Sequence, residues 1–315
     1  MENFITVTDV ENLEFLLEEA KRTKENPLKD NGIGKNKTLG LLFFNPSLRT
    51  RLSTQKAGQN LGMNVMVMNI NEDGWKIETR FGVVMDEDKT EHIKEAAGVI
   101  GQYCDIIGIR AFPKLIDREE DYSEPVLMQF MQYSGVPVVS LEGATGHPLQ
   151  AFADIITIEE FKTKKTPKVV LTWAPHVKAL PQSVPNSFAE WCQSAGYELV
   201  ITHPEGYELN PEYTKNAIIE YNQEKAFKNA DFIYAKNWSS YKRYGQILCT
   251  DKKWTVDAKK MSLTNNAKFM HCLPVRRNLI VTDEVIDSSN SIVIKQAANR
   301  VVSAQVVLKE ILKNI

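Results

Sequence analysis

The sequence predicts an α/β protein of two domains, each built on a parallel β-sheet flanked by helices. Apolar segments of strand length alternate with helical patterns in both halves of the chain. At 315 residues the chain also exceeds the roughly 250–300 residues at which a single core stops growing. Ligands of such folds bind beyond the carboxyl ends of strands, so the polar residues that follow each strand are the first candidates for a site.

The first half begins with an amphipathic helix, because leucines recur at helical spacing over residues 9–24. A long polar stretch over 71–90 shows no core periodicity and is predicted to be a functional loop. The other elements expected in this half are strands over 37–44, 64–68, 104–110 and 137–140 and helices over 47–62 and 91–102.

The second half repeats the alternation. Proline at position 148 favours a helix start there, and this helix, over 147–162, is predicted to cross between the domains. The other expected elements are strands over 169–173, 198–201, 231–234, 268–270 and 291–294 and helices over 186–195, 211–229 and 297–313.

The turn after the strand at 37–44 is the strongest candidate for an anion site. A strand, a turn and a helix start leave unpaired backbone N–H groups and the positive end of the helix dipole at one spot. Arg49 and Arg51 lie in the first helical turn, where positive charge opposes the dipole by roughly 0.3–1 kcal/mol per charge. We therefore expect a bound anion such as phosphate; two solvated surface arginines are the alternative.

Composition excludes several classes of function. Hydrophobic residues at 43% and charged residues at 25% are typical of a globular protein, and a net charge of −2 gives no surface for nucleic acid. The four cysteines lie far apart without a Cys-x-x-Cys pair, so neither a disulfide framework nor a metal site is predicted. With no signal-peptide pattern and no membrane-length apolar stretch, we expect a cytoplasmic protein without a membrane partner.

Cationic and polar residues follow the predicted strands in both halves. Several arginines with a histidine and few carboxylates suit an anionic, carbonyl-bearing substrate. The groups at these strand ends are Ser47 to Arg51, Arg110, His147 with Gln150, His176, Lys236 and the stretch from His271 to Arg277.

Three ordered motifs resemble the aspartate/ornithine carbamoyltransferase family. They are Ser47-Leu48-Arg49-Thr50-Arg51, His147-Pro148-Leu149-Gln150 followed by Ala153-Asp154, and His271-Cys272-Leu273-Pro274 followed by Arg276. The resemblance covers almost the whole chain, and its Cys-Leu-Pro form is typical of the ornithine branch. It implies that residues 1–150, joined by the C-terminal helix 297–315, bind carbamoyl phosphate, and that residues 151–296 bind the second substrate.

The resemblance also implies the roles of residues at the first site. His147 at a helix start is biased toward its neutral form and would donate to a developing oxyanion; a plain helix cap is the alternative. His147, Cys272 and Arg110 would be catalytic, although Cys272 read alone is a buried thiol. The implied carbamoyl-phosphate residues are Ser47, Leu48, Arg49, Thr50, Trp75, Arg110, His147, Gln150, Cys272, Leu273 and Arg300.

Two departures from the free-ornithine enzymes resemble the N-acylornithine subgroup. Residues 244–261 lack the Ser-Met-Gly stretch whose aspartate pairs with the α-ammonium of ornithine, and an acylated amine needs no such partner. The 71–90 loop carries Trp75, which would reach into a neighbouring subunit of a homotrimer. The implied acylornithine residues are Glu142, His176, Lys236, Arg276, Thr90 and Lys178.

Thr90 bears on which acyl group is accepted. Acetyl-specific members carry a glutamate at the aligned position and succinyl-specific members a proline, and an uncharged side chain would not repel a succinyl carboxylate. The expected reaction is carbamoyl transfer from carbamoyl phosphate to the δ-amine of N-succinyl-L-ornithine, in arginine biosynthesis, without metal or organic cofactor. The alternatives are an N-acetylornithine enzyme, an ornithine enzyme, and a catalytically silent phosphate-binding regulatory or scaffold protein.

Overall fold

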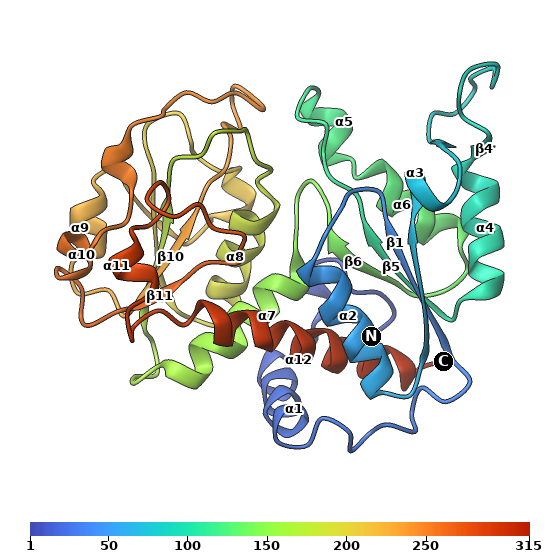
Figure 1. Cartoon of the computed structure of the whole chain (residues 1–315), viewed down its shortest axis with the longest axis horizontal. Coiled ribbons are helices and arrows are strands. Elements are labelled where there is room, and N and C mark those ends of the chain that lie inside the picture. The colour runs from blue at the N-terminus through green and yellow to red at the C-terminus, as the bar shows by residue number, and fades with distance from the viewer. The chain divides into compact units, whose positions relative to one another are not determined.

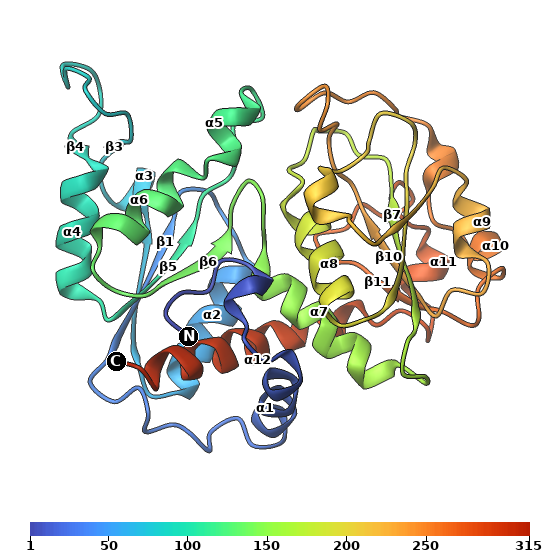
Figure 2. The same ribbon diagram turned by 180° about the vertical axis from the view of Figure 1, so that it is seen from behind.

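Two parallel β-sheets organise the chain, one in each of two units (Figures 1 and 2). The computed structural model describes residues 1–315, the side chain of Asn71 excepted. Unit 1 comprises Met1–Leu149 and Arg300–Ile315, and unit 2 comprises Gln150–Asn299. The predicted α/β class with two parallel sheets is confirmed, and the C-terminal helix returns to the first unit as predicted.

The sheet of unit 1 has the strand order β2-β1-β5-β6. Its strands are β2 (Asn64–Asn69), β1 (Thr38–Phe43), β5 (Ile106–Arg110) and β6 (Val138–Glu142). The chain places β2 on one side of β1, and then places β5 and β6 on the other side. The strand order therefore reverses between β1 and β5, where Phe43 pairs with Arg110. Crevices at such switch points are where open α/β sheets bind ligands.

The sheet of unit 2 has the order β11-β10-β7-β8-β9. Its strands are β11 (Lys268–Met270), β10 (Phe232–Lys236), β7 (Lys168–Trp173), β8 (Glu198–Thr202) and β9 (Ile218–Glu220). The order reverses between β7 and β10, where Trp173 pairs with Lys236. Each sheet therefore has one switch point, and each lies beside predicted site residues.

Helices cover both sheets, and two of them, α7 and α12, continue from one unit into the other. No helix in the described chain has the length and apolar content of a membrane span. The helices are α1 (Leu13–Glu25), α2 (Arg49–Asn60), α3 (Ile70–Asp73), α4 (Ile93–Tyr103), α5 (Arg118–Tyr122), α6 (Pro125–Tyr133), α7 (Pro148–Phe161), α8 (Ser183–Ser194), α9 (Gln223–Phe227), α10 (Ala258–Met261), α11 (Asp283–Ile286) and α12 (Val293–Leu312).

The helix predicted over 211–229 is wrong. A short 3-10 turn at Pro211–Tyr213 leads instead into β9, where the β-branched pair Ile218 and Ile219 extends along β8. The side chain of Asn222 then accepts a hydrogen bond from the backbone N–H of Lys225 and begins the separate helix α9.

The strand predicted over 291–294 is also wrong. Ser291 forms only an isolated bridge with Phe269, and α12 begins at Val293. Burial recurs at Val293, Gln296 and Arg300, which is helical rather than strand spacing.

Smaller differences lie in unit 1. The opening helix begins at Leu13 rather than at residue 9, because Asn12 caps it through the N–H of Phe15. The 71–90 loop is shorter than predicted: it follows α3 and contains β3 (Ile77–Glu78), which pairs with β4 (Glu91–His92). No element was predicted between 111 and 136, where α5 and α6 lie.

Candidate active site

The turn between β1 and α2 forms the first part of the candidate site. A cavity of about 420 Å³ is lined there by residues 43–48 together with Arg51, Asn69 and Glu72. Leu48 stands at the N-cap of α2 and makes no side-chain cap hydrogen bond. The helix start is thus built to present its N–H groups to an anion rather than to its own cap.

Arg300 reaches this turn from the C-terminal helix. Its Nη2 donates to Thr50 Oγ1 at 2.6 Å, and both side chains are buried. A residue 250 positions away in sequence therefore fixes the hydroxyl of Thr50 in the first turn of α2. The structure brings the predicted phosphate residues Ser47 to Thr50 and Arg300 together within unit 1.

Arg110, at the end of β5, links the turn after β1 to Glu142 at the end of β6. Its Nη1 donates to the carbonyl oxygens of Asn45 (3.1 Å) and Pro46 (2.8 Å), and its Nη2 donates to Glu142 Oε2 at 3.2 Å. His147 Nε2 lies 3.6 Å from the same carboxylate oxygen. Arg110 is buried, and these oxygens are the acceptors for its Nη1 and Nη2 groups.

Glu142, at the end of β6, is grouped with Arg110 and His147 in unit 1. It is buried, and it is the acidic partner of the Arg110 guanidinium. An ionised carboxylate only accepts hydrogen bonds, so Glu142 can also hold an N–H of a substrate.

Trp75 and Thr90 lie at the same end of the parallel pair β3 and β4, in the segment over residues 75–92 that we call the Trp75 bracket. The indole Nε1 of Trp75 donates to Glu91 Oε2 at 2.7 Å, and the N–H of Thr90 donates to the carbonyl of Lys76 at 3.1 Å. The side chain of Trp75 is 56% exposed in the single chain. The bracket thus presents a large aromatic surface and an uncharged side chain to the outside of unit 1.

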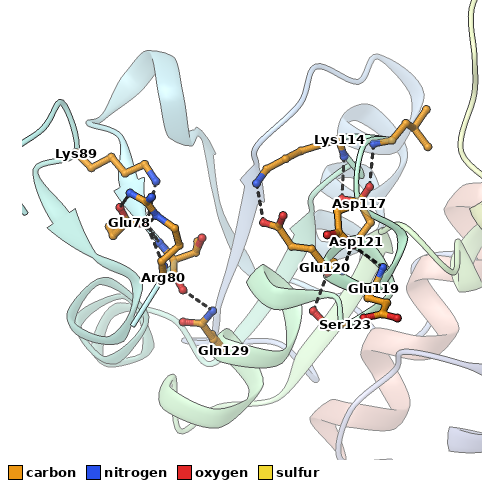
Figure 3. Close-up of polar contacts among 12 residues, drawn as sticks. Glu78, Arg80, Lys89, Lys114, Asp117, Glu119, Glu120, Asp121, Ser123 and Gln129 are labelled. Atoms are coloured by element: carbon orange, nitrogen blue, oxygen red, sulfur yellow. Dashed lines mark hydrogen bonds and ion pairs between the residues drawn. The ribbon is translucent and has the colours of Figure 1, made fainter. Parts of the chain in front are cut away.

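Glu78 stabilises this bracket. Its buried carboxylate accepts hydrogen bonds from the side chains of Arg80 (2.7 Å) and Lys89 (2.9 Å) and from the N–H of Arg80, as Figure 3 shows. These donors, Arg80 first, hold the pKa of Glu78 far below its ordinary value. The loop that carries Trp75 and Thr90 is therefore closed at its base by charge-assisted hydrogen bonds.

Four predicted acylornithine residues gather at the switch point of unit 2. Arg276 Nε donates to His176 Nε2 at 3.1 Å, and His176 Nδ1 lies 3.0 Å from both the backbone nitrogen and the carbonyl oxygen of Lys178. Burial, and then the charges of Lys236, Arg276 and Lys178, lower the pKa of His176. In the described part of the chain none of these three cations has an acidic partner, so the cluster is suited to binding carboxylates.

Gln150 and the loop after β11 are linked through two buried residues: Asp154, which belongs to the sequence motif but was given no role, and Gln296, which the sequence did not predict. Gln150 Nε2 and Gln296 Nε2 each donate to Asp154 Oδ1 at 2.7 Å, and Gln296 Oε1 accepts from the N–H of His271. The four-residue spacing of Gln150 and Asp154 on one helix was a usable signal. Gln296 offered none, because its partners are distant in sequence.

Cys272 and Leu273 follow β11 in this same loop. Cys272 is buried, and Leu273 has a left-handed backbone (φ 56°) whose N–H donates to His271 Nδ1 at 2.8 Å. Such a conformation is uncommon for a residue with a branched side chain and marks a locally constrained turn. The cysteine motif is thus held by His271 and, through Gln296, by Asp154.

Two family models cover most of the chain. The model described as "Aspartate/ornithine carbamoyltransferase, carbamoyl-P binding domain" matches residues 2–160, and that described as "Aspartate/ornithine carbamoyltransferase, Asp/Orn binding domain" matches residues 181–311. The chain belongs to the aspartate/ornithine carbamoyltransferase family. The predicted resemblance is therefore confirmed at the family level.

Relatives within this family differ in similarity. The chain is 60% identical to N-succinylornithine carbamoyltransferase of Bacteroides fragilis and 59% identical to that of Bacteroides thetaiotaomicron, over 100% of both chains in each case. It is 38% identical to N-acetylornithine carbamoyltransferase of Xanthomonas axonopodis pv. citri, over 91% of this chain and 89% of that protein. The succinyl enzymes are thus the more similar of the two groups.

Solved structures of the family share the whole fold. An N-acetyl-L-ornithine transcarbamylase with one glutamate replaced by alanine, complexed with carbamyl phosphate and N-succinyl-L-norvaline, has a TM-score of 0.93 and 36% identity, covering 99% of this chain and 100% of that one. An acetylornithine transcarbamylase complexed with acetylcitrulline has the same TM-score and identity, covering 99% of both chains.

The cluster of unit 2 predicts the titration of His176. In the free protein His176 should titrate below its usual pKa of 6.5, and Lys236→Met should raise that pKa because one neighbouring cation is lost. The unfolded chain binds a proton at His176 more readily than the folded chain does. The free energy of unfolding should therefore fall as the pH drops from 6.5 toward the folded pKa, and this loss should be smaller in Lys236→Met.

Histidine NMR titration, with denaturant unfolding at several pH values, measures both effects. Lys242→Met is the matched control, because Lys242 is exposed and is not among the charges that shift His176. A His176 pKa above 6.5, or one that responds equally to both substitutions, would contradict the cluster.

Proposed function

We propose that the chain transfers the carbamoyl group of carbamoyl phosphate to the δ-amine of N-succinyl-L-ornithine, giving N-succinyl-L-citrulline and phosphate in arginine biosynthesis. The observation that carries this proposal is 60% identity to an N-succinylornithine carbamoyltransferase over the full length of both chains. The cation clusters support it, because both substrates bring anionic groups. All four cysteines are free thiols, which suits the reducing cytoplasm that we propose as its location.

The phosphate of carbamoyl phosphate is proposed to bind at the turn before α2. Backbone N–H groups at the helix start, with Ser47, Arg49, Thr50 and Arg300, would hold its oxygens. Arg110 and His147 would contact the carbonyl oxygen of the carbamoyl group, with Gln150 at its amide. Positioning of two reactants can contribute as much as about 7–11 kcal/mol, so the geometry of these donors would account for much of the catalysis.

Attack by the neutral δ-amine forms the new C–N bond and moves an electron pair onto the carbonyl oxygen. His147 and Arg110 would stabilise this oxyanion by hydrogen bonds directed to where the charge develops. When the intermediate collapses, the C–O bond to phosphate breaks, phosphate leaves with the electron pair, and it takes up the proton released by the amine. Cys272 and Leu273 would face the amine, and Glu142 would accept from an N–H of the acylated ornithine.

The acylated ornithine brings two carboxylates, one at the α-carbon and one at the end of the succinyl group. Lys178, Lys236 and Arg276, arranged around the neutral His176, supply cations for them. Thr90 adds no negative charge that would repel the succinyl carboxylate. An acetyl group would leave one of these interactions unused.

Acyl specificity is predicted to depend on the charge at position 90. Given carbamoyl phosphate and each substrate in turn, the wild type should prefer N-succinylornithine over N-acetylornithine and over free ornithine. Thr90→Glu should lower kcat/KM for the succinyl substrate about tenfold or more, since about 1.4 kcal/mol of repulsion is a factor of ten. Thr90→Gln is the control, because glutamine is similar in size to glutamate but uncharged. This variant should retain the preference for N-succinylornithine.

The measurement is formation of the ureido product in parallel assays. A strong acetyl preference of the wild type would overturn the choice of acyl group. Binding of carbamoyl phosphate without turnover of any substrate would favour a catalytically silent phosphate-binding protein instead.

We further propose a homotrimer in which the Trp75 bracket completes the site of a neighbouring subunit. Arg49→Ala removes the phosphate contact within a subunit, and Trp75→Ala removes the contact donated to the next one. After the two inactive variants exchange subunits in equal amounts, about a quarter of the sites should combine an intact Arg49 with an intact Trp75. Activity should recover accordingly, and its absence after exchange has been verified by mass spectrometry would count against shared sites.

A further inference from the structure

The segment formed by α5 and α6 contacts three loops of unit 1 through polar side chains. Asp121 accepts from the N–H groups of Lys114 and Leu115, in the loop that follows Arg110, and Gln129 Nε2 donates to the carbonyl of Thr79 in the Trp75 bracket (Figure 3). Glu124 contacts the third loop, over residues 143–146. This loop is the one that connects Glu142 to His147.

Glu124 has an unusual backbone for its position. It is left-handed, with φ 48° and ψ 52°, and it directly precedes Pro125. Residues with a side chain are uncommon in this region, and a following proline normally favours an extended conformation. Strained residues of this kind persist where the surrounding structure holds them and cluster at functional sites.

The carboxylate of Glu124 is directed at the 143–146 loop and not at its own helix. Although Glu124 occupies the N-cap of α6, it makes no side-chain cap hydrogen bond there. One oxygen accepts from the N–H of Thr145 at 2.7 Å and from Thr145 Oγ1 at 2.8 Å. The N–H of Ala144 is a further donor to the carboxylate.

The loop passes directly against this carboxylate at Gly143. A Cβ at that position would lie 2.5 Å from both carboxylate oxygens of Glu124, closer than any side chain tolerates. The N–H of Gly143 donates to the carbonyl of Gly146 at 2.9 Å and closes the loop. A side chain at 143 would therefore have to displace the carboxylate of Glu124.

We propose that Glu124 is a positioning residue that fixes the 143–146 loop and thereby sets His147 and Glu142 relative to Arg110. This role rests on the proposed carbamoyl transfer. Glu142 precedes the loop and binds Arg110 at 3.2 Å, and His147 follows it with its Nε2 3.6 Å from the same carboxylate. Burial raises the pKa of Glu124, and the Thr145 and Ala144 donors oppose that shift, so the contact with the loop favours the ionised form of this carboxyl.

The first test is Glu124→Gln in the full-length enzyme. A glutamine side chain has one acceptor oxygen where glutamate has two, because its amide nitrogen only donates. The variant therefore loses one of the two oxygens that can accept from the backbone N–H groups of Ala144 and Thr145. We expect kcat to fall by about 10- to 100-fold, as small displacements of catalytic groups do, while KM for carbamoyl phosphate changes little. Glu120→Gln is the matched control on the same segment and should leave kcat unchanged, because the side-chain carboxylate of Glu120 forms an exposed ion pair with Lys114, away from the 143–146 loop.

The second test is a double-mutant cycle. Gly143→Ala should lower kcat in the wild-type background, because the new Cβ displaces the Glu124 carboxylate. In a Glu124→Ala background the space is open, so the same substitution should have little further effect. Equal effects in both backgrounds would show that Gly143 acts independently of Glu124.

Amide hydrogen exchange at Ala144 and Thr145 separates this inference from the proposed reaction. Faster exchange in Glu124→Gln than in Glu120→Gln, together with the fall in kcat, supports positioning. Unchanged exchange overturns the contact, and faster exchange with unchanged kcat overturns its role. If the wild type itself fails to turn over any acylornithine, the proposed reaction fails, and the positioning role fails with it even where exchange still reports the contact.

Discussion

The candidate site of unit 1 depends on the buried guanidinium of Arg110. A buried cation needs hydrogen-bond acceptors, and here two backbone carbonyls of the turn after β1 and the carboxylate at the end of β6 accept from its Nη1 and Nη2 groups. This interaction crosses the switch point of the sheet and links loops from three strands. The turn that is proposed to bind phosphate and the residues proposed to bind the carbamoyl group are therefore held by one side chain.

The two units share one architecture but differ in how their cationic groups are arranged. In each, the strand order reverses once, and polar residues following the adjacent strands collect there. Unit 1 combines a helix start with the buried Arg110 and Arg300, which we propose bind a phosphoryl group. Unit 2 groups three cations around a histidine whose pKa is lowered by burial and then by their charges, and we propose that they bind the carboxylates of the second substrate.

Much of this could be predicted from sequence, because buried parallel strands are continuous apolar runs and the residues after them are polar. The turn at Ser47 to Arg51 and the helix at His147 were recognisable for that reason. The helix predicted over 211–229 failed because pairing with β8 overrode a weak helical pattern. Glu124 and Gln296 were not predicted. The hydrogen-bond partner of each lies far away in the sequence, Thr145 for Glu124 and His271 for Gln296.

The most direct measurement of the central claim is a crystal structure of the protein soaked with carbamoyl phosphate. We expect phosphate oxygens within about 2.7–3.2 Å of the backbone N–H groups at the start of α2, with Arg110 and Arg300 beside them. A well-defined ligand bound elsewhere, with this turn empty, would contradict the account.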